Sequence, residues 1–496
     1  MEYLLAHDVG TSGDKAVIYT SDGRLVAEAF SGYATDYPQA KWAEQDPETW
    51  WAAFCKANRE LLDQSGVNPA DILALSFSAQ MNSCLPLDTE GKPLRRAMIW
   101  ADQRAGSEAD ELANALGLKA VYERTGQRLS ASHGIAKMMW FARHEPGLFQ
   151  KTAAFVQPKD YLSFRLTGVI ASDYSDASHL GCFDLNQMVW SEEILRAAGI
   201  GRDRMPELQP SYAVTGSVNL GAALACGLKS GTPVVMGGGD GPCATAGAGI
   251  SHSGQAYAVL GSSGWIATLS DTPYYDPGMR TFNLMYLDGR RFMPLGSVQM
   301  AGLALNWALD TLFAGEELDA LYPRLDDLLE GIPAGSLGLL FLPYLLGERS
   351  PWWNSDASGC FIGLTPRHDR EAMLKAVLEG VGLNMKIILD CLNAGVGVHE
   401  MRVIGGGARS VAWLRILADV WQQPLYIPQM LQYATGMGAA ICAGIGAGVY
   451  KDFDHAAQIN PIRSLIQPDI ANRPVYTAAL ERFLSVYKAL EPIVFS

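Results

Sequence analysis

The sequence predicts an α/β protein built from two related lobes. Its 496 residues exceed what one hydrophobic core usually supports, so two domains of roughly 240 residues each are expected. Residues 4–19 read as two short apolar strands around the turn Gly10-Thr11-Ser12-Gly13. The pattern recurs at 256–269, around Gly261-Ser262-Ser263-Gly264, about 250 residues further along the chain. One such hairpin in each half predicts two lobes that hold one nucleotide between them.

The first hairpin has the chemistry of a phosphate site. Its glycines permit a turn that points successive backbone N–H groups inward, and a concave row of donors binds phosphate. Thr11 and Ser12 add hydroxyl donors, Lys15 adds a cation, and Asp8 before the turn can hold Mg²⁺. Because neighbouring side chains alternate along a strand, Asp14 is expected to point away from the nucleotide. The alternative is a polar hairpin in which Asp8 only caps the turn.

Composition narrows the class of protein. The formal net charge is −14, from 38 Lys and Arg against 52 Asp and Glu, which argues against a nucleic-acid binder. The eight cysteines are scattered without a C-x-x-C pair, as expected of small buried hydrophobes in a reducing compartment. No basic-then-apolar leader precedes the first strand, and the Gly/Ala-rich stretch 434–450 predicts a close-packed core helix. A cytoplasmic protein without a membrane partner is expected.

Polar residues follow two predicted strands of the first half. Asp46 and Pro47 are typical of a helix N-cap and first helical position, and this helix is expected to run to about residue 64. A buried strand is predicted over 72–78, and another begins at Ala97. Ligands of α/β folds bind at strand ends. The candidate substrate contacts are Gln80, Met81, Asn82 and Trp100, and the second strand also places Asp102 and Arg104 at this edge. The alternative is a loop without a ligand, above all for Met81.

Two glycine runs follow predicted strands further along. The strand 233–236 leads into Gly237-Gly238-Gly239 and then Asp240, which is either a turn former or a catalytic base where the lobes meet. Residues 403–404 lead into Gly405-Gly406-Gly407 and a helix near Val411, whose N–H groups can face a nucleotide. The alternative for this second run is a tight turn with no ligand. Neither a P-loop nor a G-x-G-x-x-G fingerprint occurs, so ATP would need the paired hairpins.

Seven segments, taken together, resemble the FGGY carbohydrate kinases, and more closely their xylulokinase branch. They occur in family order, cover nearly the whole chain, and are individually weak but strong as an ordered set. The segments are 8–13 with Lys15, 42–47, 158–162, 171–177, 237–240, 341–344 with 347–349, and 405–410.

The resemblance implies two actin-like domains of the ribonuclease-H type, expected at 1–245 and 246–496, with ATP and a sugar in the cleft between them. It implies Asp240 as general base and Asp8 as the residue that organises Mg²⁺. It also implies a set of nucleotide-binding positions, namely Gly10, Thr11, Ser12, Lys15, Gly261, Ser262, Gly406 and Gly407.

The implied reaction is transfer of the γ-phosphate of ATP to a ketose, with D-xylulose as the first candidate. Two sugar-edge positions depart from the xylulokinase pattern, because Asn82 stands where a histidine is common and Gly241 where an asparagine is common. The alternatives are a kinase for another ketose or a polyol, and a non-catalytic ATP switch of the actin/Hsp70 type. A homodimer is compatible with the sequence, which carries no signal for the oligomeric state.

Overall fold

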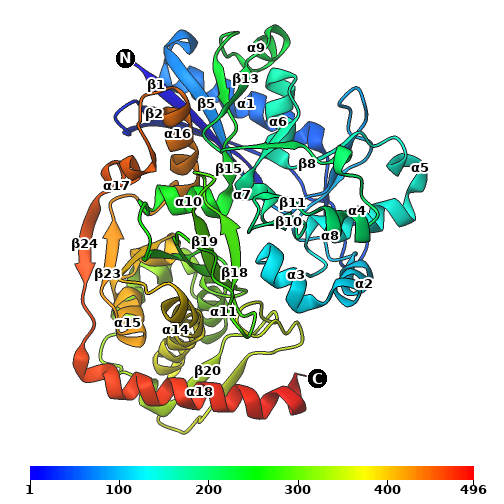
Figure 1. Ribbon diagram of the computed structural model, residues 1–496. Coiled ribbons are helices and arrows are strands. Elements are labelled where there is room, and N and C mark those ends of the chain that lie inside the picture. The colour runs from blue at the N-terminus through cyan, green and yellow to red at the C-terminus, as the bar shows by residue number, and fades with distance from the viewer. Residues whose placement is uncertain (496) are drawn as a thin grey trace.

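The structure is a computed structural model that describes residues 1–495. Two seven-stranded sheets, one in each half of the chain, form its framework (Figure 1). The first sheet has the order β13-β14-β5-β1-β2-β3, and β15 also pairs with β5. Its strands are β1 (Tyr3–Val9), β2 (Gly13–Thr20), β3 (Leu25–Gly32), β5 (Ile72–Ala79), β13 (Val214–Ser217), β14 (Pro233–Val235) and β15 (Gly238–Gly239).

The second sheet has the order β18-β19-β17-β16-β22-β23-β24. Its strands are β16 (Gln255–Leu260), β17 (Gly264–Thr268), β18 (Phe282–Met285), β19 (Phe292–Val298), β22 (Glu400–Ile404), β23 (Leu425–Pro428) and β24 (Ile462–Ile466).

The two sheets share one topology. In the first, β3, β2 and β1 form an antiparallel meander and β5 and β14 continue it in parallel. In the second, β19, β17 and β16 form the meander and β22 and β23 continue it in parallel. Both predicted hairpins are therefore present on equivalent strands, and the prediction of two related α/β lobes is confirmed. The expected division at residues 245/246 falls inside helix α10 (Asp240–Gly247) and stays a prediction.

Two helices pack closely together where the lobes meet. α10 lies against α16 (Ala434–Gly446), which also covers β1 and β5 (Figure 1). A Cβ at Gly247 would collide with the carbonyl of Ala434, and one at Gly438 with the carbonyl of Cys243. The small residues let the backbones of the two helices touch, which confirms the predicted close-packed core helix. The helix ends at Gly446 rather than at Tyr450.

Helix α1 (Pro47–Ser65) begins as expected, since the Asp46 side chain accepts a hydrogen bond from the backbone N–H of Glu48. The C-terminal lobe adds α14 (Arg370–Gly395) and α15 (Val411–Trp421). The strand expected from Ala97 is only two residues long, because the polypeptide turns away after β7 (Ala97–Met98).

The remaining helices and strands surround this framework. The helices are α2 (Gly106–Leu116), α3 (Leu118–Thr125), α4 (Gly134–His144), α5 (Pro146–Phe149), α6 (Pro158–Thr167), α7 (Tyr174–Ala177), α8 (Glu192–Ala197), α9 (Leu220–Cys226), α11 (Gly302–Leu312), α12 (Leu318–Leu321), α13 (Leu325–Leu328), α17 (Ala456–Ile459) and α18 (Arg473–Val494). The short strands are β4 (Glu44–Gln45), β6 (Leu85–Leu87), β8 (Ala154–Val156), β9 (Ala171–Asp173), β10 (Phe183–Asp184), β11 (Val189–Trp190), β12 (Glu207–Gln209), β20 (Leu340–Leu342) and β21 (Cys360–Ile362).

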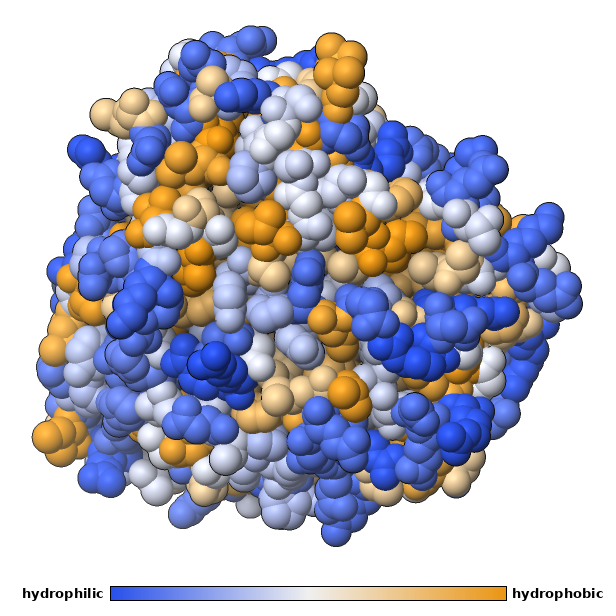
Figure 2. Space-filling model, turned by 45° about the horizontal axis from the view of Figure 1, so that its top comes forward, coloured by the Kyte–Doolittle hydropathy of each residue, from blue (hydrophilic) through white to orange (hydrophobic). Residues whose placement is uncertain are grey.

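The surface mixes polar and apolar side chains. Figure 2 shows apolar groups interspersed among polar ones on the face it presents, which is ordinary for a folded protein. Among residues 1–495, no helix is both long and apolar enough to cross a membrane. All eight cysteines are free, and six of them are buried.

Candidate active site

The turn of the first hairpin is held by a polar network. Trp100 Nε1 donates to Thr11 Oγ1 at 2.8 Å, and Gln45 Nε2 donates to the carbonyl of Thr11 at 2.7 Å. Gln80 Nε2 donates to Gln45 Oε1 at 2.8 Å and to the carbonyl of Gly10 at 3.3 Å. The structure thereby brings the sugar-edge candidates Gln80 and Trp100 to the phosphate turn. Sequence reasoning assigned Gln45 no role, since its only local signal is its place before a helix cap.

Asp8 faces the C-terminal lobe. Its Oδ2 accepts a hydrogen bond of 2.6 Å from Thr435 Oγ1, at the start of α16. Burial raises the pKa of Asp8, and the hydroxyls of Thr435 and Ser78 partly oppose that rise. Lys15 lies opposite Asp8 in the hairpin, and its Nζ is 5.1 Å from the ring centroid of Tyr433. Residues 433–435 therefore complete the site from the other lobe, which no local pattern indicated.

Asp14 lies on the other face of the same hairpin. Its Oδ2 is 2.8 Å from Nδ1 of His7, and both side chains are fully buried. The His7 ring packs 4.2 Å from the ring of Phe54 on α1. Asp14 thus faces the core of the N-terminal lobe, as the alternation of side chains along a strand predicts.

Asp240 is the first residue of α10 and directly follows β15. Its Oδ1 accepts a hydrogen bond of 2.8 Å from the backbone N–H of Gly241. Burial, followed by the charge of nearby Asp8, raises the pKa of Asp240 to about 7. Two carboxylates from distant parts of the sequence therefore lie within electrostatic reach of each other, and one of them is poised to exchange a proton near neutral pH.

The backbone before Asp240 is fixed by two contacts. The N–H of Gly239 donates to Ser175 Oγ at 3.0 Å. A Cβ at Gly239 would collide with the side chain of Met81, which is only 5% exposed. Met81 therefore packs beneath the strand that carries Asp240, and glycine is needed there for that close approach.

The raised pKa of Asp240 predicts a pH dependence. If Asp240 is the general base that the family resemblance implies, its protonated carboxyl cannot accept the proton of the substrate hydroxyl below about pH 7. We expect kcat/KM for the sugar to rise as the pH increases through about 7 and then to level off. Initial rates of ADP release between pH 5.5 and 9, at several sugar concentrations, measure this rise in kcat/KM. A kcat/KM that stays constant down to pH 5.5 would contradict the role of Asp240.

Asn82 has an unusual environment. Its φ is 59°, in the left-handed region, and its buried Oδ1 has no hydrogen-bond partner among residues 1–495. Its carbonyl accepts a bond of 2.8 Å from Lys137 Nζ, which also donates to the carbonyl of Ile99 at 2.7 Å. Burial lowers the pKa of Lys137 to about 7. Lys137 thus joins the loop of Asn82 to the loop of Trp100. The side-chain Oδ1 of Asn82 stays available to a ligand.

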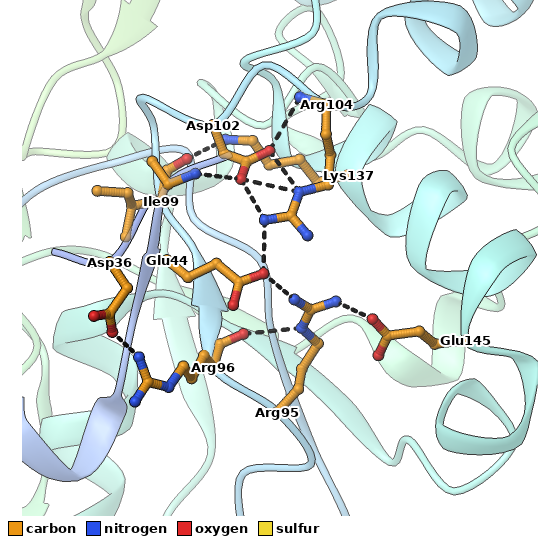
Figure 3. Close-up of polar contacts among 10 residues, drawn as sticks. Asp36, Glu44, Arg95, Arg96, Ile99, Asp102, Arg104, Lys137 and Glu145 are labelled. Atoms are coloured by element: carbon orange, nitrogen blue, oxygen red, sulfur yellow. Dashed lines mark hydrogen bonds and ion pairs between the residues drawn. The ribbon is translucent and has the colours of Figure 1, made fainter. Parts of the chain in front are cut away.

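Asp102 and Arg104 lie behind this edge rather than on it. Figure 3 shows Arg104 between Asp102 and Glu44, and Arg95 on the other side of Glu44. Arg104 Nη2 is 2.6 Å from Asp102 Oδ2 and 2.6 Å from Glu44 Oε1, and its side chain is 1% exposed. Asp102 is fully buried. Because these ion pairs bury both groups behind Trp100, Asp102 and Arg104 support the Trp100 loop, and of the Arg104 guanidinium only Nη1 lacks a hydrogen-bond partner among residues 1–495.

The second hairpin lies beside the late glycine run. The carbonyl of Ser262 accepts bonds of 3.0 Å from the N–H groups of Ala301 and Leu303. Gly405 has φ +96°, and a Cβ there would lie 2.7 Å from the carbonyl of Leu260, the residue before Gly261. The structure therefore gathers one group of candidates at the end of β16, namely Gly261, Ser262, Gly406 and Gly407.

These glycines allow a direct test of nucleotide contact. A Cβ at Gly10 would lie 3.6 Å from its nearest neighbour and one at Gly261 3.3 Å away, while Gly406 has no neighbour within 4 Å. We expect Gly10→Ala, Gly261→Ala and Gly406→Ala each to weaken ATP binding about tenfold, because the new methyl groups intrude where phosphates meet the backbone. Isothermal titration with ATP measures the affinity.

Gly407→Ala, at the fourth candidate glycine, tests stability instead. Its Cβ would lie 2.6 Å from the ring of Trp413, so this variant should lower the melting temperature, whereas the other three should not. Unchanged ATP affinity in Gly261→Ala, beside a loss in Gly10→Ala, would contradict nucleotide binding by both hairpins.

The chain matches both sequence models of one enzyme family. Residues 3–247 match the N-terminal domain of the FGGY family of carbohydrate kinases, and residues 256–447 match its C-terminal domain. The chain belongs to the FGGY family of carbohydrate kinases. The predicted family and the predicted pair of actin-like domains are thus confirmed, and the protein is a sugar kinase that uses ATP as a substrate.

Individual relatives of this FGGY kinase cover it from end to end. A xylulose kinase of Bacillus subtilis (strain 168) is 32% identical over 489 residues, which are 98% of this chain and 97% of the relative. A gluconokinase of Bacillus licheniformis is 30% identical over 500 residues, 99% of this chain and 96% of the relative. The crystal structure of ligand-bound xylulose kinase from Lactobacillus acidophilus superposes with a TM-score of 0.94 at 27% identity, covering 100% of this chain and 99% of the other.

Proposed function

We propose that this FGGY kinase transfers the γ-phosphate of ATP to a terminal hydroxyl of an open-chain sugar, converting D-xylulose to xylulose 5-phosphate. The observation that carries the proposal is Asp240, a carboxyl with a pKa of about 7 at the junction of the lobes, next to Asp8. The xylulose kinase of Bacillus subtilis supports the choice of sugar, because the similarity spans both domains.

The reaction needs positioning and charge neutralisation more than covalent work. The sugar hydroxyl attacks the γ-phosphorus, its proton passes to the Asp240 carboxylate, and the bond to the ADP oxygen breaks. The donors of the two hairpins and the ammonium of Lys15 offset charge on the phosphates. Closure of the lobes excludes water, which limits hydrolysis of ATP without sugar.

Asp8 would hold a magnesium ion that enters with ATP. Mg²⁺ commonly takes one or two protein carboxylates together with substrate phosphates. The charge of Asp8 contributes to raising the pKa of Asp240, so a cation held at Asp8 would reduce a repulsion that the structure contains. When bound, the ion neutralises charge on the transferring phosphate.

The free cysteines support a cytoplasmic location, because a reducing compartment keeps them unpaired.

The choice of sugar is tested with a panel of ketopentoses, ketohexoses and pentitols, assayed for ADP release. The alternatives are another ketose or a polyol as preferred substrate.

We expect Asn82→Ala to lower kcat/KM for the preferred sugar about tenfold or more, because Asn82 Oδ1 has no protein partner and is free to bind a hydroxyl. The KM for ATP should be little changed. Asn68→Ala, at an exposed 3₁₀-helix cap, is the control. Equal kcat/KM in wild type and Asn82→Ala would show that Asn82 does not recognise the sugar.

A further inference from the structure

The first turn of helix α10 carries Asp240 and is weakly fixed by its own residues. Its N-cap, Gly239, has no side chain that could accept a hydrogen bond from the free N–H groups of this turn. Gly241, directly after Asp240, is also a glycine, and glycine has more backbone freedom than any other residue. The N–H of Gly241 is nevertheless the group that donates to Asp240 Oδ1 at 2.8 Å. The orientation of the proposed base therefore depends on what holds Gly241 in place.

A buried tyrosine of the second sheet holds the carbonyl of Gly241. The hydroxyl of Tyr257, on β16, donates to that carbonyl at 3.0 Å, and the tyrosine side chain is fully buried. Thr245 Oγ1, one turn further along α10, lies 3.0 Å from the same carbonyl and 3.1 Å from the Tyr257 hydroxyl oxygen. Burial raises the pKa of Tyr257, its hydrogen bonds oppose that rise, and the charge of Asp240 adds to it. Tyr257 therefore lies near Asp240 and contacts the residue that orients its carboxyl.

Tyr257 is bonded in turn to the second hairpin. Trp265 Nε1 donates to the Tyr257 hydroxyl at 2.9 Å, and the two rings meet edge-on with 6.5 Å between their centroids. Trp265 is the second residue of β17 and follows the turn Gly261-Ser262-Ser263-Gly264. Two hydrogen bonds, from Trp265 to Tyr257 and from Tyr257 to Gly241, thus join the proposed phosphate turn to the residue after the proposed base.

The direction of these two hydrogen bonds is fixed by their chemistry. An indole N–H can only donate, so the Tyr257 oxygen accepts from Trp265 and its hydroxyl hydrogen is left for the carbonyl of Gly241. Consecutive hydrogen bonds of this kind polarise and strengthen one another in a buried environment. The alternative is an ordinary set of core hydrogen bonds that stabilises the fold and has no part in catalysis.

We propose that Tyr257 and Trp265 are positioning residues that hold the Asp240 carboxyl in place when a nucleotide occupies the second hairpin. The proposal rests on the kinase function inferred above and on Asp240 as its base. Neither aromatic side chain exchanges a proton in the reaction, and the proton of the sugar hydroxyl still passes to Asp240. Because Trp265 directly follows the turn, a nucleotide that orders the turn also fixes the indole and, through Tyr257, the peptide of Gly241. Small errors in the placement of a reacting group are costly, and about 1 Å can cost about 10²-fold in rate.

Tyr257→Phe removes only the hydroxyl and tests the proposal directly. With D-xylulose and ATP, we expect this variant to lower kcat about tenfold, because the base is less well placed. The KM for D-xylulose and the ATP affinity measured by calorimetry should change little, since the Tyr257 hydroxyl bonds only to protein groups. The matched control is Tyr286→Phe, because the Tyr286 hydroxyl is also fully buried and donates to a backbone carbonyl, that of Ile250, at 3.1 Å. Both variants should lower the melting temperature similarly, and only Tyr257→Phe should lower kcat.

Combined variants separate positioning from a general loss of structure. In an Asp240→Asn background, Tyr257→Phe should change the residual kcat by less than about twofold, because it acts through the carboxyl that is already absent. Trp265→Phe should lower kcat severalfold by itself. Adding Trp265→Phe to Tyr257→Phe should cause little further loss, since both changes break the same connection. Trp265 is half-buried, so Trp265→Phe also provides the comparison with Tyr286→Phe if Tyr257→Phe is recovered poorly.

The outcomes distinguish the inference from the function on which it rests. A kcat of Tyr257→Phe equal to that of Tyr286→Phe, with Asp240→Asn strongly impaired, overturns the inference and leaves the proposed function intact. A further loss of about tenfold when Tyr257→Phe is added to Asp240→Asn also overturns it, because the effect would not pass through Asp240. Wild-type turnover in Asp240→Asn refutes the proposed base together with the inference, and absence of sugar-dependent ADP release in the unmodified enzyme refutes the proposed function.

Discussion

Asp240→Asn is expected to lower kcat by about 10²- to 10⁴-fold, the usual contribution of a positioned general base. The amide is nearly the same size as the carboxyl and cannot take the hydroxyl proton, while the hairpins that bind ATP are untouched. Steady-state ADP release gives kcat, and calorimetry gives the ATP affinity, which should change little. Asp71→Asn, in an exposed 3₁₀ turn, is the control. Turnover within a few-fold of wild type in Asp240→Asn would remove Asp240 from the mechanism.

The same variant should be more stable than wild type at alkaline pH. The pKa of Asp240 is about 7 in the folded protein and near 3.8 when unfolded, so its ionised form penalises the folded state above pH 7. Removing that charge should stabilise the fold by about 2 kcal/mol at pH 8, once partial solvent exposure is allowed for. The gain should shrink as the pH falls from 7 toward 4, because the folded carboxyl is then neutral and the unfolded one becomes progressively protonated too. Melting temperatures of both proteins at pH 8 and pH 5 measure the difference.

Lys159→Met is expected to be the most destabilising of these substitutions. Lys159 Nζ lies 2.5 Å from Asp160 Oδ1, 2.9 Å from Asp173 Oδ1 and 3.1 Å from Asp176 Oδ2, and all four side chains are buried. Removing the cation leaves three carboxylates without a counter-charge, which costs about 3–5 kcal/mol or more and is a large part of the stability of a typical domain.

The effect should reach the active site as well. Asp173 caps α7, and Ser175 on that helix holds the backbone of Gly239. We expect Lys159→Met to melt many degrees lower or to be recovered mostly insoluble, with Lys151→Met at an exposed position as control. Because burial and the neighbouring carboxylates already raise the pKa of Asp176, protonation at pH 5 should recover part of the loss. A melting temperature within about 2 °C of wild type would show that the cluster does not stabilise the fold.

The elements that could be predicted from the sequence are those whose signal is local. The hairpin turns at Gly10 and Gly261 are marked by glycine between short apolar runs, and α1 by Asp46 and Pro47 at its start. The short β7 and the burial of Asp102 and Arg104 escaped this reasoning. Polar residues after a strand look alike in sequence whether they face a ligand or pair with one another. Here the ion pair between Arg104 and Glu44 shows that Arg104 pairs inside the protein.

By itself the sequence determined the fold class, the repeated hairpin, the family and the positions of Asp8 and Asp240. Turn chemistry, strand periodicity and motif order are properties of short segments and of their order along the chain. Only the tertiary structure decided that Thr435 would bond Asp8, that Asp8 would raise the pKa of Asp240, and that Tyr257 would bond Gly241. Burial and charge at a site are set by side chains that folding brings together from hundreds of residues apart, and no short segment records them.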